Sequence, residues 1–80
     1  MLEKTIILKD FEAVKIFVDI ASEKPYDIEL LSGKYVVNAK SIMGVFSLDL
    51  TKPLVMVAHT DTHAELLRQT AQFENVQTKK

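Results

Sequence analysis

The sequence predicts an α+β fold, a two-layer open-faced β-sandwich in which three helices cover one face of a four-stranded antiparallel sheet. Four short segments have strand patterns, and three others repeat apolar residues at helical spacing. One strand alternates apolar with acidic residues, which indicates a sheet with one solvent-facing side. The elements follow the order strand, helix, strand, strand, helix, strand, helix (βαββαβα). We expect residues 1–80 to form this one domain.

The first half of the chain predicts a strand, a helix and a hairpin. Residues 5–8 are a β-branched run typical of a buried strand. Asp10 is placed to cap a helix that Pro25 ends. Residues 26–30 alternate apolar and acidic side chains, and a Ser-Gly turn returns the chain as a strand at 35–37. The apolar stripe of the helix comprises Phe11, Val14, Phe17, Val18 and Ala21.

The second half predicts a short helix, a central strand and a last helix. Ser41 opens a helix through Leu48. Residues 54–58 are apolar throughout, which suits a central strand that is buried more deeply than the edge strands. Thr62 and Glu65 have the spacing of a capping box, although either of the two residues before Thr62 is an alternative cap. The stripe of the last helix comprises Leu66, Leu67, Thr70, Ala71 and Phe73.

The composition is that of a soluble globular chain, with 48% hydrophobic and 26% charged residues among 80. A net charge of -1 gives no support to nucleic acid or an anionic membrane as a partner. The chain has no cysteine, so disulfides and thiolate metal sites are excluded. The first apolar run is too short for a signal peptide or a membrane-spanning helix, and we therefore expect a cytoplasmic protein.

The most specific motif is the run at residues 37–48, Val-Asn-Ala-Lys-Ser-Ile-Met-Gly-Val-Phe-Ser-Leu. It resembles the stretch around the regulatory serine in HPr, the histidine-containing phosphocarrier of the bacterial sugar phosphotransferase system. The match includes Met43 and Gly44, which helix propensity alone would not select. In that family a dedicated kinase phosphorylates the serine and a transcriptional regulator reads it. The resemblance therefore implies regulatory phosphorylation of Ser41, while a simple N-cap role would also keep a serine there.

The second signature of the HPr family does not occur here. The family has a phosphorylatable histidine at the start of the first helix and an arginine two residues later, and the family's spacing from Ser41 leads to Asp10 and Glu12. Phosphoryl relay needs a near-neutral imidazole, together with amides and a cation that hold the phosphate. Asp10 could form an acyl phosphate, but Glu12 would repel the phosphoryl group. We interpret Asp10 as a helix cap.

The two histidines of the chain lie far from that point. His59 ends the fourth predicted strand and His63 falls in the first turn of the last helix. Together they lack a third ligand at a spacing that suits a metal ion. We expect both to be surface residues without a catalytic role, and we expect no metal or cofactor.

The helix that begins at Ser41 predicts a protein-binding surface. Val45 and Leu48 can fill the core, which turns Ile42, Met43 and Phe46 toward solvent as an exposed apolar patch. In HPr proteins the corresponding residues, with the lysine that precedes the serine, dock the phosphotransferase enzymes, and this implies the same role for Lys40. The alternative for Phe46 is a place in the core.

The sequence thus favours an HPr-like protein that has lost the phosphoryl-accepting histidine and is not an enzyme. We expect it to act as a protein-binding or regulatory module through residues 41–48. Its implied partners are phosphotransferase-system enzymes, HPr kinase or a transcriptional regulator, and we expect a monomer. One alternative is an active phosphocarrier with an unorthodox acceptor residue. Another is a relic of the fold with no partner.

Overall fold

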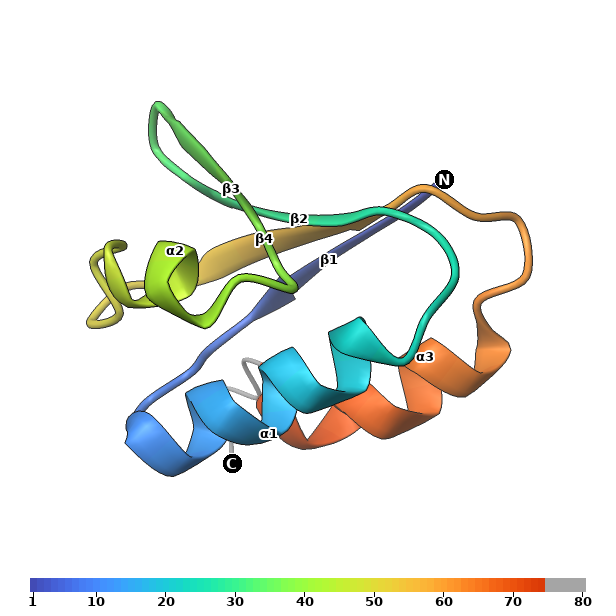
Figure 1. The fold of residues 1–80 in the computed structure, drawn as a ribbon, viewed down its shortest axis with the longest axis horizontal. Coiled ribbons are helices and arrows are strands. Elements are labelled where there is room, and N and C mark those ends of the chain that lie inside the picture. The colour runs from blue at the N-terminus through green and yellow to red at the C-terminus, as the bar shows by residue number, and fades with distance from the viewer. Residues whose placement is uncertain (75–80) are drawn as a thin grey trace, which may run out of the picture.

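Four strands form one antiparallel sheet in the order β1-β4-β2-β3 in the computed structural model, which describes residues 1–74. Figure 1 shows α1 and α3 side by side against one face of this sheet, with α2 near one end. The predicted fold class is therefore confirmed. The strands are β1 (Leu2–Ile6), β2 (Ile28–Ser32), β3 (Tyr35–Asn38) and β4 (Leu54–Ala58), and the helices are α1 (Phe11–Ser22), α2 (Ile42–Phe46), α3 (Ala64–Thr70) and the 3-10 turn η1 (Ala71–Phe73).

The core lies between the sheet and the helices. Alternate residues of each strand point to one face, so β4 places Leu54, Met56 and Ala58 against the helices. Phe17 of α1 meets Phe73 edge to face, with ring centroids 5.9 Å apart. The helical stripe and the strand alternation that predicted two layers therefore meet in a single apolar cluster.

The first strand is β1, Leu2–Ile6, and the prediction of residues 5–8 was wrong in its bounds. Its register runs from Leu2 opposite Ala58 to Ile6 opposite Leu54. Leu8 is buried beyond the strand end. The strand was predicted too late in the chain because Glu3 and Lys4 are charged and interrupt the apolar pattern. A short apolar run shows which residues are buried, and it does not show which residues pair with another strand.

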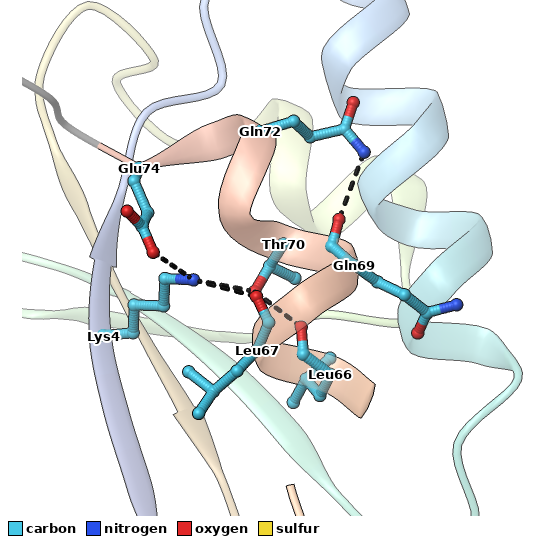
Figure 2. Close-up of polar contacts among 7 residues, drawn as sticks. All are labelled: Lys4, Leu66, Leu67, Gln69, Thr70, Gln72 and Glu74. Carbon is cyan, nitrogen blue, oxygen red and sulfur yellow. Dashed lines mark hydrogen bonds and ion pairs between the residues drawn. The ribbon is translucent and has the colours of Figure 1, made fainter. Parts of the chain in front are cut away.

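Lys4 lies on the helix-facing side of β1, and its side chain is only 10% exposed. Figure 2 shows its ammonium between three acceptors from the C-terminal segment. Nζ lies 2.9 Å from Glu74 Oε2, 3.2 Å from Thr70 Oγ1 and 3.3 Å from the Leu67 carbonyl. An ammonium has three donors, so Lys4 is fully satisfied and holds α3 and the following residues against β1.

The start of α3 differs from the prediction. His63 occupies the N-cap without a side-chain hydrogen bond, and none of the three residues predicted as caps does so. The Thr60 hydroxyl instead accepts from the Thr62 amide at 3.1 Å, which builds the preceding turn. The helix ends at Thr70 and tightens into η1, and this change of pitch leaves Ala71 exposed rather than buried as its spacing predicts.

Candidate functional site

Asp10 is the N-cap of α1, as the sequence predicts. Its backbone is extended, and its Oδ1 accepts a hydrogen bond of 2.8 Å from the Ala13 amide. Glu12 stands exposed in the first turn, where the helix dipole favours a negative charge. Helix capping and the helix dipole therefore explain why Asp10 and Glu12 occur at this helix end.

A hollow of about 360 Å³ lies between the first turns of α1 and the residues after α3. The apolar residues that line it are Ile7, Ala13, Ile16 and Phe73. The described residues that line it include Lys9 and three carboxylates but no histidine or arginine. The hollow thus offers no imidazole nucleophile, and its carboxylates would oppose an incoming phosphoryl group.

Ser41 is the N-cap of α2. Its Oγ accepts a 3.2 Å hydrogen bond from the Gly44 amide, and the residue is exposed. At the other end the Ser47 hydroxyl donates to the Gly44 carbonyl at 2.6 Å. The helix spans Ile42–Phe46, which is shorter than the predicted span from Ser41 through Leu48 because Ser41 and Ser47 are its caps.

Gly44 lets α2 approach its neighbours closely. A Cβ at this position would lie 3.3 Å from Ser41 Oγ and 3.5 Å from the Cβ of Val37 in β3. The first distance is tighter than ordinary van der Waals contact. A glycine inside this short helix therefore preserves both the serine cap and the contact with the sheet.

Four apolar side chains form a surface across α1 and α2, which we call the docking face: Phe11, Ile42, Met43 and Phe46. Met43 is 77% exposed and Ile42 is 37% exposed. Phe46 is half-buried and stacks on Phe11 with ring centroids 5.1 Å apart and 14° between the planes. The sequence left open whether Phe46 lies on the exposed patch or in the core. The structure shows that this side chain belongs partly to each.

Phe11 was wrongly predicted to lie in the core stripe of the first helix. It is 59% exposed, because it begins α1 and its ring lies against α2 instead of the sheet. The ammonium of Lys15 lies 5.5 Å from its ring centroid. Helical spacing alone cannot predict that Phe11 is exposed. The feature of the sequence that could have indicated it is the position of this aromatic residue directly after the N-cap, in the first turn of the helix.

Lys40 lies next to the docking face with its ammonium already bonded. Its Nζ donates to the Lys24 carbonyl at 2.8 Å, and its backbone amide donates to Asn38 Oδ1 at 2.9 Å. The side chain therefore links the start of α2 to the segment after α1. A partner that contacts this ammonium has to compete with that hydrogen bond.

The two histidines do not meet the start of α1. His59 Nε2 lies 3.1 Å from Glu29 Oε1 on the sheet, and the half-buried His63 caps α3. Figure 1 shows that α3 begins at the end of the molecule opposite to the start of α1. Within residues 1–74, no group of three or more His, Cys, Asp or Glu side chains is placed to hold a metal ion.

Tyr26 and Asp49, which line neither the docking face nor the hollow, have shifted pKa values. Burial, with a smaller contribution from the Glu65 charge, raises the pKa of Tyr26 above its ordinary value. Hydrogen bonds from the Thr51 hydroxyl and amide lower the pKa of Asp49.

Neither a protein-family model nor a curated protein matches the chain. Solved structures do match it. HPr-C-His from Thermoanaerobacter tengcongensis is 29% identical, with a TM-score of 0.75 over 90% of this chain and 89% of the other. The phosphocarrier protein HPr from Bacillus anthracis is 26% identical, with a TM-score of 0.70 over 91% and 96%.

These two neighbours match the chain over nearly its whole length, and both are HPr proteins. No helix within residues 1–74 has the length and apolarity needed to cross a bilayer. The strand order, the three helices and the neighbours agree with the resemblance first seen at residues 37–48. The chain therefore has the fold of the HPr phosphocarriers.

Proposed function

We propose that this protein is a cytoplasmic, non-enzymatic binding module of the HPr type that docks other proteins without relaying phosphate. The observation that carries the proposal is the docking face, which lies beside a helix start where Asp10 is the cap. The partners that fit the resemblance are phosphotransferase-system enzymes, HPr kinase or a transcriptional regulator.

The chemistry of the docking face supports a protein partner. Met43 is long, flexible and largely exposed, and it lies on the same short helix as the stacked Phe46. Methionine adapts to irregular partner surfaces, and aromatic residues dominate the energy of many interfaces. The face is small and apolar and includes no buried charge, as is common for the centre of a transient interface.

The start of α1 supports the absence of phosphoryl relay. The side chain of Asp10 is used as a cap, and Glu12 adds a negative charge in the first turn of α1, two residues further on. A phosphate needs cations or free amides around it, and the Ala13 amide is already bonded to Asp10.

Ser41 is the proposed switch of the same surface. Its hydroxyl is exposed and directly precedes Ile42, so a phosphate there would add about -2 charge beside the apolar face. The added charge would disfavour a partner that buries Ile42 and Met43. In this proposal phosphorylation regulates affinity and leaves the fold intact.

A titration with the general phosphotransferase enzyme tests the docking face. Replacing Phe11 and Met43 together by Ala should weaken binding at least tenfold, because each removes exposed apolar contact area. Val36→Ala, at an exposed apolar site on the opposite face of the sheet, is the control and should leave binding unchanged. Equal binding by the wild type and the double variant would refute the docking face.

A second measurement tests the loss of relay. After incubation with phosphoenolpyruvate and the general enzyme, the intact mass of the protein should stay unchanged. A stoichiometric phosphoryl adduct that Asp10→Asn abolishes would establish the alternative, an active carrier with an unorthodox acceptor. An adduct at His59 or His63 would equally overturn the proposal.

A further inference from the structure

The sulfur atoms of the chain are all thioethers, and they lie in very unequal environments. The sequence has three methionines and no cysteine. Met56 in β4 is fully buried in the core, whereas Met43 in α2 is 77% exposed and Met1 is 67% exposed. No thiol competes for an oxidant, and the susceptibility of sulfur follows its exposure. An oxidant in solution therefore reaches the thioether of Met43 or of Met1 first.

Met43 differs from Met1 in its place on the molecule. Met43 belongs to the docking face, on the same short helix as Phe46, whose ring stacks on Phe11. Met1 lies just before β1, and its amino group is 3.8 Å from Asp61 Oδ1. Figure 1 shows the N-terminus at the end of the sheet away from α2. A change of polarity at Met43 therefore alters the docking face, while the same change at Met1 leaves it intact.

We propose that Met43 is a redox-sensitive modification site, at which a peroxide converts the thioether into a sulfoxide and thereby weakens partner binding. A lone pair on the sulfur attacks one oxygen of hydrogen peroxide, and the O–O bond breaks. The proton of the transferred oxygen goes to the departing hydroxide, which leaves as water. The sulfur is oxidised by two electrons and the peroxide is reduced by two. This inference rests on the proposed docking function and adds a means of regulating it.

The exposure of Met43 explains why oxidation would change binding and leave the fold intact. In the free protein the sulfoxide oxygen lies in water, because the side chain makes little contact with the core. A partner that covers Met43 removes this oxygen from water, which costs free energy unless the partner supplies a hydrogen bond. The same oxygen on Met56 would lie inside the core and disturb its packing.

The sulfoxide would act differently from a phosphate on Ser41. A sulfoxide is polar but carries no net charge, and methionine sulfoxide reductases convert it back to the thioether. Its effect on affinity should therefore change little with salt, whereas the effect of a phosphate should be screened. The docking face would then have two independent switches, one at Ser41 and one at Met43.

Peroxide treatment of the full chain tests the modification site without any partner. After the peroxide is removed, peptide mass analysis should show one added oxygen at Met43, formed roughly tenfold or more faster than at Met56. Circular dichroism of the oxidised protein should match that of the untreated protein. Oxidation of Met56 as fast as that of Met43, or unfolding that accompanies oxidation of Met43, would overturn the proposal.

A titration with the general phosphotransferase enzyme tests the effect on docking. The oxidised wild type should bind about tenfold more weakly than the untreated protein, because a covered sulfoxide oxygen loses its water. Reduction by a methionine sulfoxide reductase should restore the affinity. Met43→Leu is the matched control, since it keeps an apolar side chain, retains Met1 and has no sulfur on the docking face. Peroxide should leave the affinity of this variant unchanged.

The possible results separate this inference from the docking function. If the untreated protein binds and oxidation does not change its affinity, the switch at Met43 is refuted and the docking face stands. If oxidised Met43→Leu also loses affinity, the change arises elsewhere and the switch is again refuted. If the untreated protein does not bind, the docking function fails, and the regulatory role of Met43 fails with it.

Discussion

At Asp10, one side-chain oxygen satisfies an amide that α1 would otherwise leave without a partner. We expect Asp10→Ala to lower the free energy of unfolding by about 1 kcal/mol. Asp10→Asn should cost less, since asparagine is an equally good cap. Urea unfolding of both variants, with Glu12→Gln as the matched control, measures the difference. Equal stability of Asp10→Ala and the wild type would contradict the capping role.

Lys4 gives a second residue-scale prediction. Its ammonium has three acceptors, whereas Glu74 is nearly half exposed. Lys4→Ala should therefore destabilise by about 1–3 kcal/mol, because it removes a buried stem and leaves acceptors at Leu67 and Thr70 without their donor. Glu74→Gln should cost about 0–1 kcal/mol, as exposed ion pairs do. Thermal unfolding compares the two, and the reverse ranking would show that the ion pair dominates.

Local chemistry explains which site residues could be predicted from the sequence. The caps at Asp10 and Ser41 were predicted because a cap depends on its own side chain and the amide three residues on. Phe11 was missed because its exposure depends on where the sheet ends. His63 was missed as a cap because the threonines before it bond to each other.

At the scale of elements, β4 has two unequal faces. Met56 is fully buried between the sheet and the helices, whereas Val57 lies on the open face of the sheet between Glu3 and Glu29 and is 7% exposed. We expect Met56→Ala to cost about 2–5 kcal/mol and Val57→Ala about 1 kcal/mol. Denaturant midpoints of the two variants give the comparison, and equal costs would mean that both faces of the sheet are covered.

The loop before β4 predicts an acid dependence. Thr51 donates its hydroxyl and amide hydrogen bonds to the Asp49 carboxylate and lowers its pKa, so this carboxylate stabilises the fold above its unfolded pKa and loses that contribution as the pH falls. Asp49→Asn should therefore make the thermal midpoint less sensitive to pH below about pH 4. Parallel pH profiles of variant and wild type test this, with Asp61→Asn as an exposed control. Identical profiles would contradict the assignment.

For the whole molecule, a negative charge at Ser41 should change the affinity for a partner without changing the stability of the fold. Ser41→Asp keeps a capping oxygen and adds a charge beside Ile42. We expect its thermal midpoint to stay close to that of the wild type and its affinity for a phosphotransferase partner to fall. Ser41→Asn is the matched control without the charge. If Ser41→Asp lowers the stability and leaves the affinity unchanged, Ser41 does not have the proposed regulatory role.

The fold class was predictable because the alternation at residues 26–30 and the helical spacing of apolar residues in the first and last helices can be read from the sequence alone. The bounds of β1 were not, since Glu3 and Lys4 interrupt its apolar pattern and only pairing with β4 defines it. The position of Lys4 on the helix-facing side of the sheet could not be predicted either, because its three acceptors lie more than sixty residues away along the chain.

The position of β4 in the sheet has a consequence for how the chain acquires its structure. β1 and β2 both hydrogen-bond to β4 and not to each other. The four-stranded sheet therefore cannot form until residues 54–58 have been synthesised. Before that point only the β2–β3 hairpin has a strand partner. On the ribosome, the first strand must therefore wait for most of the chain to be synthesised. Such long-range closure slows folding relative to a helical bundle of the same length.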